Sequence, residues 1–311
     1  MNPTINSAHV DVLLSNLMQG FINTSYIYPE VFPVVKTDGV ESGNYGLFTQ
    51  KDWYRNEAET IAPGGTFPMG GYKISTDTWN TKEIGIGTSM ADRTYNNATG
   101  VFKKTMRLGK ARWVTDRVEM AWEIRLANQI FTTGTWGTDD TTTTDWDDYV
   151  NSNPMLSIAD AIYAIESANG NTANVLVLGN KVYKDLRFSP IMLDYLGSNE
   201  RGMLKKSDLV EAFELEKILV GKSIYNTANE NQTAVYTNCW GNNALLLYVA
   251  GAPTPDPFTA SAGYFFESRG MQIKNWREGG RDAEFFRGSK MRDLKVTGAG
   301  LGYFFSNIVS A

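Results

Sequence analysis

The chain has 311 residues and a formal net charge of -5, with 42% hydrophobic and 20% charged residues. This composition is typical of a globular protein that buries a core, in one large or two ordinary domains. The negative charge argues against a surface that chiefly neutralises nucleic-acid phosphates. The single cysteine, Cys239, excludes an intramolecular disulfide and a cysteine-rich zinc site. Neither a secretory signal nor an apolar run of the ~18 residues that a membrane span needs is visible, which favours production in a cytoplasm.

The first forty residues contain an apolar stretch, from Tyr26 to Val35, without a sustained helical or strand period. Pro29 and Pro33 interrupt regular structure within it. Such a strip would be awkward if it were exposed to water. Two interpretations stay open: an arm that lies on a neighbouring subunit, and a terminal segment packed on its own domain.

Residues 41–86 are rich in Gly, Thr, Tyr, Trp and Asp. Apolar and polar residues alternate at 72–76, which predicts a strand, and four glycines bracket Thr66-Phe67-Pro68-Met69. We therefore expect a long irregular hairpin. A protruding hairpin with few buried residues stabilises its own subunit poorly and is well suited to reach another.

Residues 111–131 contain neither Gly nor Pro and predict the longest helix, which ends before Gly134. Its apolar residues form two stripes: Val114, Val118, Trp122, Leu126 and Ile130, and Met120, Ile124, Ala127 and Phe131. This is more apolar surface than a helix with its back in water requires. The helix is therefore either simply buried or also in contact with neighbours. Arg112 and Asp116 are spaced to form an i,i+4 ion pair.

The region from residue 153 to residue 253 predicts a compact α+β unit. Ser157 is expected to cap a helix that ends near Gly170, and Asn180 and Ser207 to cap the next two. Its predicted strands are 175–178, 218–225 and 244–250. Beyond it, Gly-punctuated stretches predict antiparallel strands at 264–267, 271–276, 283–288, 294–296 and 302–309.

No local pattern supports catalysis or metal binding. His9, the single histidine, lies in the predicted arm, where a site would lack rigid support. Cys239 fits a small buried residue better than a nucleophile. The aspartates of the loop 139–148 lack the regular spacing of a calcium loop, so a solvated acidic loop is favoured. Lys222-Ser223 lacks the first glycine of a phosphate-binding loop. We predict no catalytic residue, cofactor or metal, and therefore no enzyme.

Four stretches of the middle unit resemble, in order and spacing, the major capsid proteins of tailed bacteriophages: 157–162 (SIADAI), 174–179 (NVLVLG), 183–186 (YKDL) and 213–221 (FELEKILVG). The resemblance implies the Hong Kong 97-type capsid fold, an α+β fold. Its parts would be an N-terminal arm (1–40), an extended hairpin loop (41–86), a peripheral domain (87–152 and 254–311) with a spine helix (104–131), and an axial domain (153–253).

The resemblance also implies a function. Many copies would assemble, as pentamers and hexamers, into the icosahedral shell that encloses a double-stranded DNA genome without sequence-specific binding. The protein would be part of the virion, assembled in the cytoplasm of a bacterial host, without a membrane. Portal and decoration proteins are implied partners, together with a separate scaffold protein or none, because the chain starts at Met1 directly with the arm.

Apolar residues on such extensions must be buried by another subunit, so they are the predicted contact residues. They are Tyr28, Phe32 and Val34 in the arm, and Trp53, Tyr54, Phe67, Pro68 and Met69 in the hairpin. Two other functions stay open. An encapsulin-like nanocompartment shares the fold and holds cargo protein instead of DNA. A soluble hydrolase or carbohydrate-binding protein would use the Trp and Asp residues.

Overall fold

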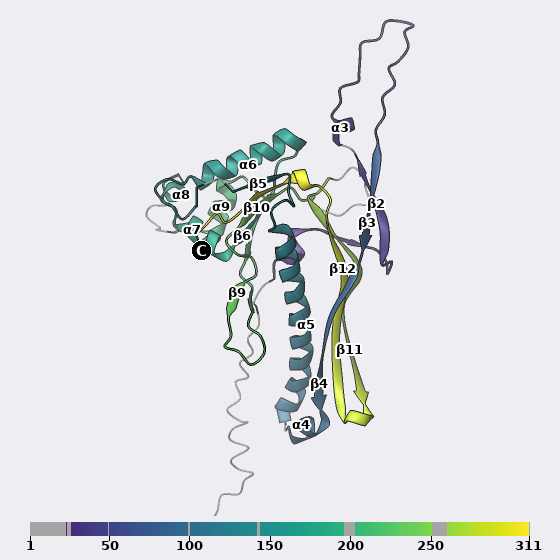
Figure 1. Ribbon diagram of the computed structural model, residues 1–311, viewed down its shortest axis with the longest axis vertical. Helices are drawn as coiled ribbons and strands as arrows, with labels where there is room; N and C mark the ends of the chain where they lie inside the picture. Colours follow the sequence, from purple (N-terminus) through teal and green to yellow (C-terminus); the bar gives the residue numbers. More distant parts are fainter. Residues whose placement is uncertain are drawn as a thin grey trace, which may run out of the picture.

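The computed structural model describes residue 23 and residues 26–48, 50–98, 100–141, 144–195, 203–250 and 260–310. His9 lies outside this described part. The described chain forms an elongated molecule, in which a body of helices packed on a sheet continues into a long helix beside a second sheet (Figure 1). A hairpin projects from the opposite end. The mixture of helices and strands confirms the predicted α+β class. No helix among the described residues is long and apolar enough to cross a membrane.

The long helix α5 (Gly100–Ile130) lies along a four-stranded sheet. The sheet has the order β1-β11-β12-β4, with β1 at Val34–Lys36, β11 at Gly263–Glu278, β12 at Ala283–Val296 and β4 at Lys82–Ala91. Helix α4 (Asp92–Asn97) and the 3-10 turn η1 (Gly279–Arg281) lie at its far end. The predicted spine helix is confirmed, and it begins earlier, at Gly100. A Cβ atom at Gly288 would stand 2.4 Å from Cγ1 of Val114, so glycine there lets α5 lie close against β12.

The strands of this sheet are longer than predicted. The stretches 264–267 and 271–276 belong to one strand, β11, and 283–288 and 294–296 to another, β12. Register shifts between Glu267 and Gln272 absorb the residues around Gly270. Such bulges keep a long antiparallel pair intact where the sequence pattern breaks.

The body of the molecule is a five-stranded sheet covered by helices. Its order is β5-β13-β10-β6-β7, with β5 at Thr138–Asp140, β13 at Gly302–Phe305, β10 at Ala244–Leu247, β6 at Val175–Gly179 and β7 at Lys217–Gly221. The helices are α6 (Pro154–Asn169), α7 (Asn180–Phe188), α8 (Pro190–Tyr195) and α9 (Lys206–Ala212). All five residues of β6 are buried, as a strand covered on both faces requires.

The predicted helix caps are each displaced, by one to four residues. Asn153 caps α6, because its Oδ1 accepts a hydrogen bond from Leu156 N (3.2 Å), whereas Ser157 already lies inside the helix. Asn180 is the first residue of α7 and follows the cap, Gly179. Lys205 caps α9, and its backbone N–H donates to Asp208 Oδ2 (3.0 Å). The end of α6 at Gly170 is confirmed: this residue has a φ of 66°, which glycine adopts without strain.

The body includes two segments expected in the peripheral domain. β13 pairs with β10 on one side and with β5 on the other. Residues 302–305, which fall in the range expected for the peripheral domain, therefore belong to the body sheet as β13. The physical reason is burial, since Phe304 and Phe305 fill cores on opposite faces of this sheet. The domain boundaries expected after residues 152 and 253 thus assign strands of this one sheet to two different domains. The boundary expected at residue 86 falls inside β4.

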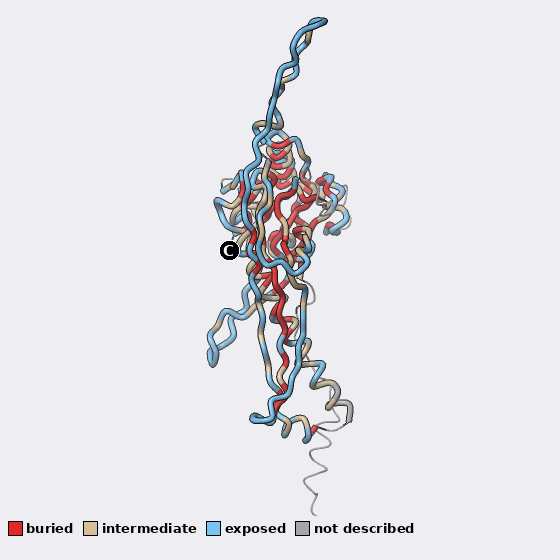
Figure 2. Tube along the Cα trace, turned by 90° about the vertical axis from the view of Figure 1, so that its right-hand side faces the viewer, coloured by how far each residue is buried: buried red, intermediate tan, exposed pale blue. Residues whose placement is uncertain are grey.

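Two hairpins extend from this framework. β2 (Ser42–Phe48) pairs with β3 (Ile74–Asn80), and the one-turn helix α3 (Gln50–Trp53) follows β2. We call residues 42–80 the long hairpin. Figure 2 shows that it is mostly exposed, with the buried Trp79 near its base, whereas buried residues gather in the body and along the long sheet. β8 (Ile224–Asn226) and β9 (Tyr236–Asn238) form a shorter hairpin below the body (Figure 1).

Candidate subunit-contact surface

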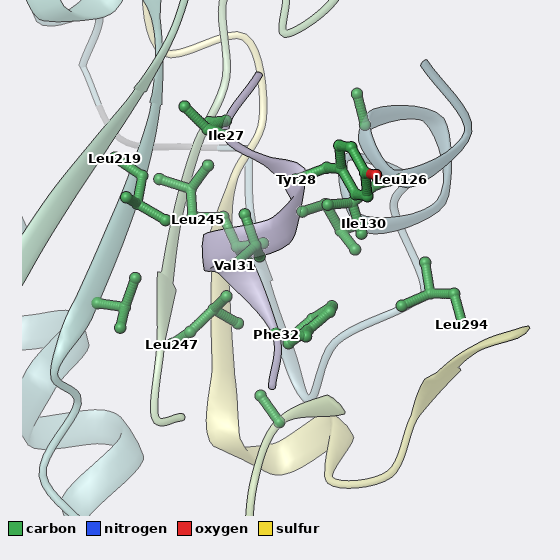
Figure 3. Close-up of a cluster of buried hydrophobic side chains, with 14 of the residues drawn as sticks. Ile27, Tyr28, Val31, Phe32, Leu126, Ile130, Leu219, Leu245, Leu247 and Leu294 are labelled. Atoms are coloured by element: carbon green, nitrogen blue, oxygen red, sulfur yellow. The ribbon is translucent and has the colours of Figure 1, made fainter. Parts of the chain in front are cut away.

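The end of the predicted arm packs on its own subunit. Tyr28 and Phe32, in and just after the short helix α2 (Tyr28–Val31), are 0% and 1% exposed. Figure 3 shows α2 between leucines of the body sheet on one side and residues of α5 on the other. Their prediction as contacts with a neighbour is therefore wrong, because a side chain already buried has no area left to offer. Val34 is half-buried and starts β1, which pairs in parallel with β11. Of the two open interpretations, packing on its own domain holds for residues 26–36.

A buried carboxylate holds this segment in place. Glu123 of α5 is 0% exposed, and its carboxylate accepts four hydrogen bonds from separate parts of the chain. The donors are Tyr28 N (2.8 Å), Ile27 N (3.2 Å), Ser223 Oγ (3.0 Å) and Trp240 Nε1 (2.6 Å). Glu123 thus joins the arm, the spine helix and the base of the β8–β9 hairpin. The sequence analysis missed it, although its place directly after the buried Trp122 is a usable signal.

The carboxylate of Glu123 gives folding stability a predictable pH dependence. Burial raises the pKa of Glu123 above its usual range, and the four hydrogen bonds oppose this rise. Between the ordinary and the raised pKa, the folded state binds more protons than the unfolded state, so stability falls as pH rises through that window. We expect the wild type to gain stability relative to Glu123→Gln, which has no titrating carboxyl there, as pH drops from neutrality toward the ordinary glutamate pKa of about 4.3. Urea unfolding of both proteins across this range measures the difference. An unchanged or reversed difference would contradict the raised pKa.

Two more acidic residues of α5 contact the same segment. Asp116 Oδ1 accepts a hydrogen bond from the hydroxyl of Tyr26 (2.6 Å), and the described residues show no ion pair between Asp116 and Arg112, contrary to the prediction. The Tyr28 hydroxyl donates to Glu119 and accepts from Lys290 Nζ (2.6 Å). Burial lowers the pKa of Lys290, helped by Arg292 and opposed by Glu119. These polar contacts fix residues 26–28 on the helix and leave them unavailable to a second subunit.

The tip of the long hairpin has the opposite character. Phe67 is 78% exposed and Met69 97% exposed, and Pro68 between them is also exposed. Tyr54 is 63% exposed, although its hydroxyl donates to Asn169 O of the body. Trp53 ends α3, and its side chain lies outside the described part. The prediction that the hairpin residues contact a neighbour therefore stays a prediction, now with exposed apolar area to support it.

Further apolar residues are exposed on the other projections, and the sequence analysis did not single them out. Ile273 (47%) and Trp276 (48%) lie toward the far end of β11, and Tyr236 (70%) in the β8–β9 hairpin. Trp276 borders an open hollow of about 380 Å³. In a strand, such residues show the same alternation as buried ones, so burial cannot be assigned to them from sequence pattern alone.

The groups considered for chemistry lie in structural settings. Cys239 is half-buried, and burial raises the pKa of its thiol, which disfavours the nucleophilic thiolate. In the acidic loop, Asp148 accepts hydrogen bonds from Val150 N (3.1 Å) and from Asn151 Nδ2 (2.8 Å), and Asp147 from Ser310 N (3.2 Å). Within the described ranges no group of three or more His, Cys, Asp or Glu is placed to hold a metal ion. These carboxylates close turns of the body.

Known proteins provide an independent comparison. No family model matches the chain. The major capsid protein of Burkholderia phage BcepMu is 29% identical over 160 residues, which cover 50% of this chain and 51% of that protein. The chain thus matches about half the length of this curated relative.

Solved structures match over nearly the whole chain. A phage-related protein from Bordetella bronchiseptica RB50 has a TM-score of 0.70 at 17% identity and covers 94% of this chain and 95% of its own. The capsid of Myoviridae phage XM1 has a TM-score of 0.55 at 12% identity, over 93% and 94% of the two chains. A virus-like particle from Pyrococcus furiosus has a TM-score of 0.53 at 13% identity, over 96% of both. The fold is that of phage capsid subunits, which confirms the predicted Hong Kong 97-type fold.

Proposed function

We propose that this chain is the major capsid protein of a tailed phage, and that many copies self-assemble into the icosahedral shell around its double-stranded DNA. The observation that carries the proposal is the similarity to a phage major capsid protein over half of both chains. The capsid fold supports it. The role is structural, and the protein acts in the virion after assembly in the cytoplasm of the bacterial host.

The shape of the subunit supports an assembling role. The long hairpin projects away from the body (Figure 2), and Phe67, Pro68 and Met69 at its tip are exposed. In a closed shell, each such contact can be weak because many of them act together. We assign these three residues, with Trp53 in α3 and Tyr54 just after it, to contacts between subunits within pentamers and hexamers.

Charge suits the proposed content of the shell. A net charge of -5 favours a wall that encloses DNA without gripping it, because many phosphate contacts would make adhesion strong and salt-dependent. No sequence-specific binding of DNA is proposed. A portal and decoration proteins, together with a separate scaffold protein or none, complete the set of proposed partners.

Sedimentation velocity of the purified chain, followed by negative-stain imaging of the fastest species, tests the proposal. We expect capsomers or closed particles that sediment far ahead of a 34.6 kDa monomer. A monomer or dimer that persists with salt and crowding agent would contradict the proposal. It would favour a hydrolase or carbohydrate-binding protein, whose melting temperature should rise with its ligand.

An encapsulin-like nanocompartment is the second candidate function. The match to a virus-like particle from Pyrococcus furiosus favours a shell without specifying what the shell holds. The contents of particles isolated from the native host decide between the two. A high ratio of absorbance at 260 nm to that at 280 nm indicates packaged nucleic acid and a phage head, whereas co-purified cargo protein indicates a nanocompartment.

A further inference from the structure

The middle part of the long hairpin, at α3, contacts the end of a body helix. Gln50, the first residue of α3, donates from Nε2 to the backbone oxygen of Ala168 (2.5 Å). The hydroxyl of Tyr54, just after α3, donates to the backbone oxygen of Asn169. Ala168 and Asn169 are the last two residues of α6. Two consecutive carbonyls of one helix end are therefore bound by side chains about 115 residues away in the chain.

The backbone carbonyls at the C-terminal end of α6 need hydrogen-bond donors from outside the helix. The last four carbonyls of an α-helix lack partners within the helix, and the partial negative charge there favours hydrogen-bond donors. α6 stops at Gly170, where a Cβ atom would stand 3.3 Å from the Tyr54 hydroxyl. A larger residue at 170 would crowd the contact. The hairpin thus supplies part of the C-terminal cap of α6.

Further hydrogen bonds connect this contact to the rest of the hairpin on one side and to the body on the other. On the hairpin side, Asp52 Oδ2 accepts a hydrogen bond from Lys73 N (3.1 Å), so α3 is tied to the opposite leg of the hairpin. On the body side, Asn169 Nδ2 donates to Gly300 O (2.6 Å), next to β13. Displacement of α6 would therefore be transmitted through α3 to both legs of the hairpin.

A second support lies at the base of the hairpin, where β2 and β3 meet the long sheet. Trp79, near the end of β3, stacks on Phe266 of β11 with ring centroids 5.4 Å apart and planes at 7°. The backbone N–H of Asn80 donates to Asp293 Oδ2 (2.9 Å) of β12. This support belongs to the long sheet, whereas α3 rests on the body. Two supports on two different layers fix a direction, which either support alone would leave free to swing.

We propose that Gln50 and Tyr54 are positioning residues that latch the long hairpin onto α6 and so set the direction in which it reaches a neighbouring subunit. This inference rests on the proposed shell function for its consequence. The latch itself is a property of the single subunit. Without the latch, the hairpin would rotate about its support on the long sheet and meet the neighbouring subunit at varying angles. The shell would then no longer have one uniform curvature.

The test uses the full chain with the double substitution Gln50→Leu and Tyr54→Phe, which removes both donors and keeps the Tyr54 ring. The matched control is Tyr45→Phe, which removes a hydroxyl from the same hairpin, where it donates to Asp77 Oδ2 (2.7 Å). We expect amide exchange at residues 50–54 to be about tenfold faster in the double variant and unchanged in the control. We also expect particles of mixed diameter and open sheets from the double variant, and uniform particles from the control and the wild type.

A rescue variant separates positioning from general damage. Gln50→Lys combined with Tyr54→Phe restores a donor that can reach the end of α6, so it should recover a uniform diameter at least in part. Wild-type exchange rates in the double variant, or particles as uniform as those of the wild type, would overturn the latch. Failure of the wild type and of Tyr45→Phe to form particles would instead count against the shell function, and the exchange rates would still decide the latch.

Discussion

We expect a subunit that lacks residues 64–71 to fold normally and to form no closed particles. All eight residues are exposed, so their removal takes nothing from the core. Burying Phe67 and Met69 against a neighbour would contribute about 2 kcal/mol each. Loss of both weakens each contact by about a thousandfold. Because every subunit of a shell makes the same contact, the loss is multiplied over the whole particle.

Point substitutions make this experiment sharper. Phe67→Ser with Met69→Ser removes the apolar area and keeps the length of the hairpin. Thr60→Ser with Thr66→Ser changes the same loop and removes only one methyl group at each position, so it serves as the control. Sedimentation velocity gives the fraction of closed particles, and circular dichroism with thermal unfolding shows that the subunit is folded. If the variant that lacks residues 64–71 formed particles of normal size and yield, the hairpin tip would not be a contact between subunits.

The largest loss of stability should follow the substitution Glu123→Ala. It removes the acceptor of four buried donors, from Ile27, Tyr28, Ser223 and Trp240. An unsatisfied buried donor costs about 1–3 kcal/mol, and entering water recovers part of this, so we expect a loss of about 4 kcal/mol. The arm segment should detach from α5 first, because two of the donors are its backbone N–H groups.

Urea unfolding of three variants checks this expectation. Glu123→Gln keeps the shape and one acceptor oxygen, so its loss should be smaller, about 2 kcal/mol. Glu211→Ala on the exposed side of α9 is the control, with an expected change within about 0.5 kcal/mol. If Glu123→Ala unfolds at the same urea concentration as the control, Glu123 does not hold the three segments together.

Much of the fold is predictable because the relevant signals are local. α5 has a long stretch without Pro, β6 has a short apolar run between Asn and Gly, and α6 ends at Gly170; each follows from neighbouring residues in the sequence. Helix starts are less predictable, because Asn153 and Ser157 are both acceptable caps. Only the turn that actually forms decides between them.

The contact surface is harder to predict, because it depends on which apolar residues the fold leaves uncovered. Phe32 and Phe67 look alike in sequence, since each lies beside a proline in a stretch without periodicity. The structure buries Phe32 against the core and leaves Phe67 78% exposed. This difference arises from core residues of α5, from Val118 onward, and of the body sheet, all more than eighty residues away from Phe32 along the chain. Glu123 is equally hidden from sequence pattern, because its four donors come together only in the folded chain.

The position of β13 governs when a subunit can be completed. This strand comes from residues 302–305, yet it lies between β5 and β10, so the body sheet cannot close until that part of the chain has left the ribosome. Pairings between residues so far apart in sequence form slowly, since a long loop must close first. A subunit interrupted during synthesis would lack this strand, leaving β5 unpaired and the edge of β10 open. If the protein forms the proposed shell, an incomplete chain would therefore offer no finished body to its neighbours.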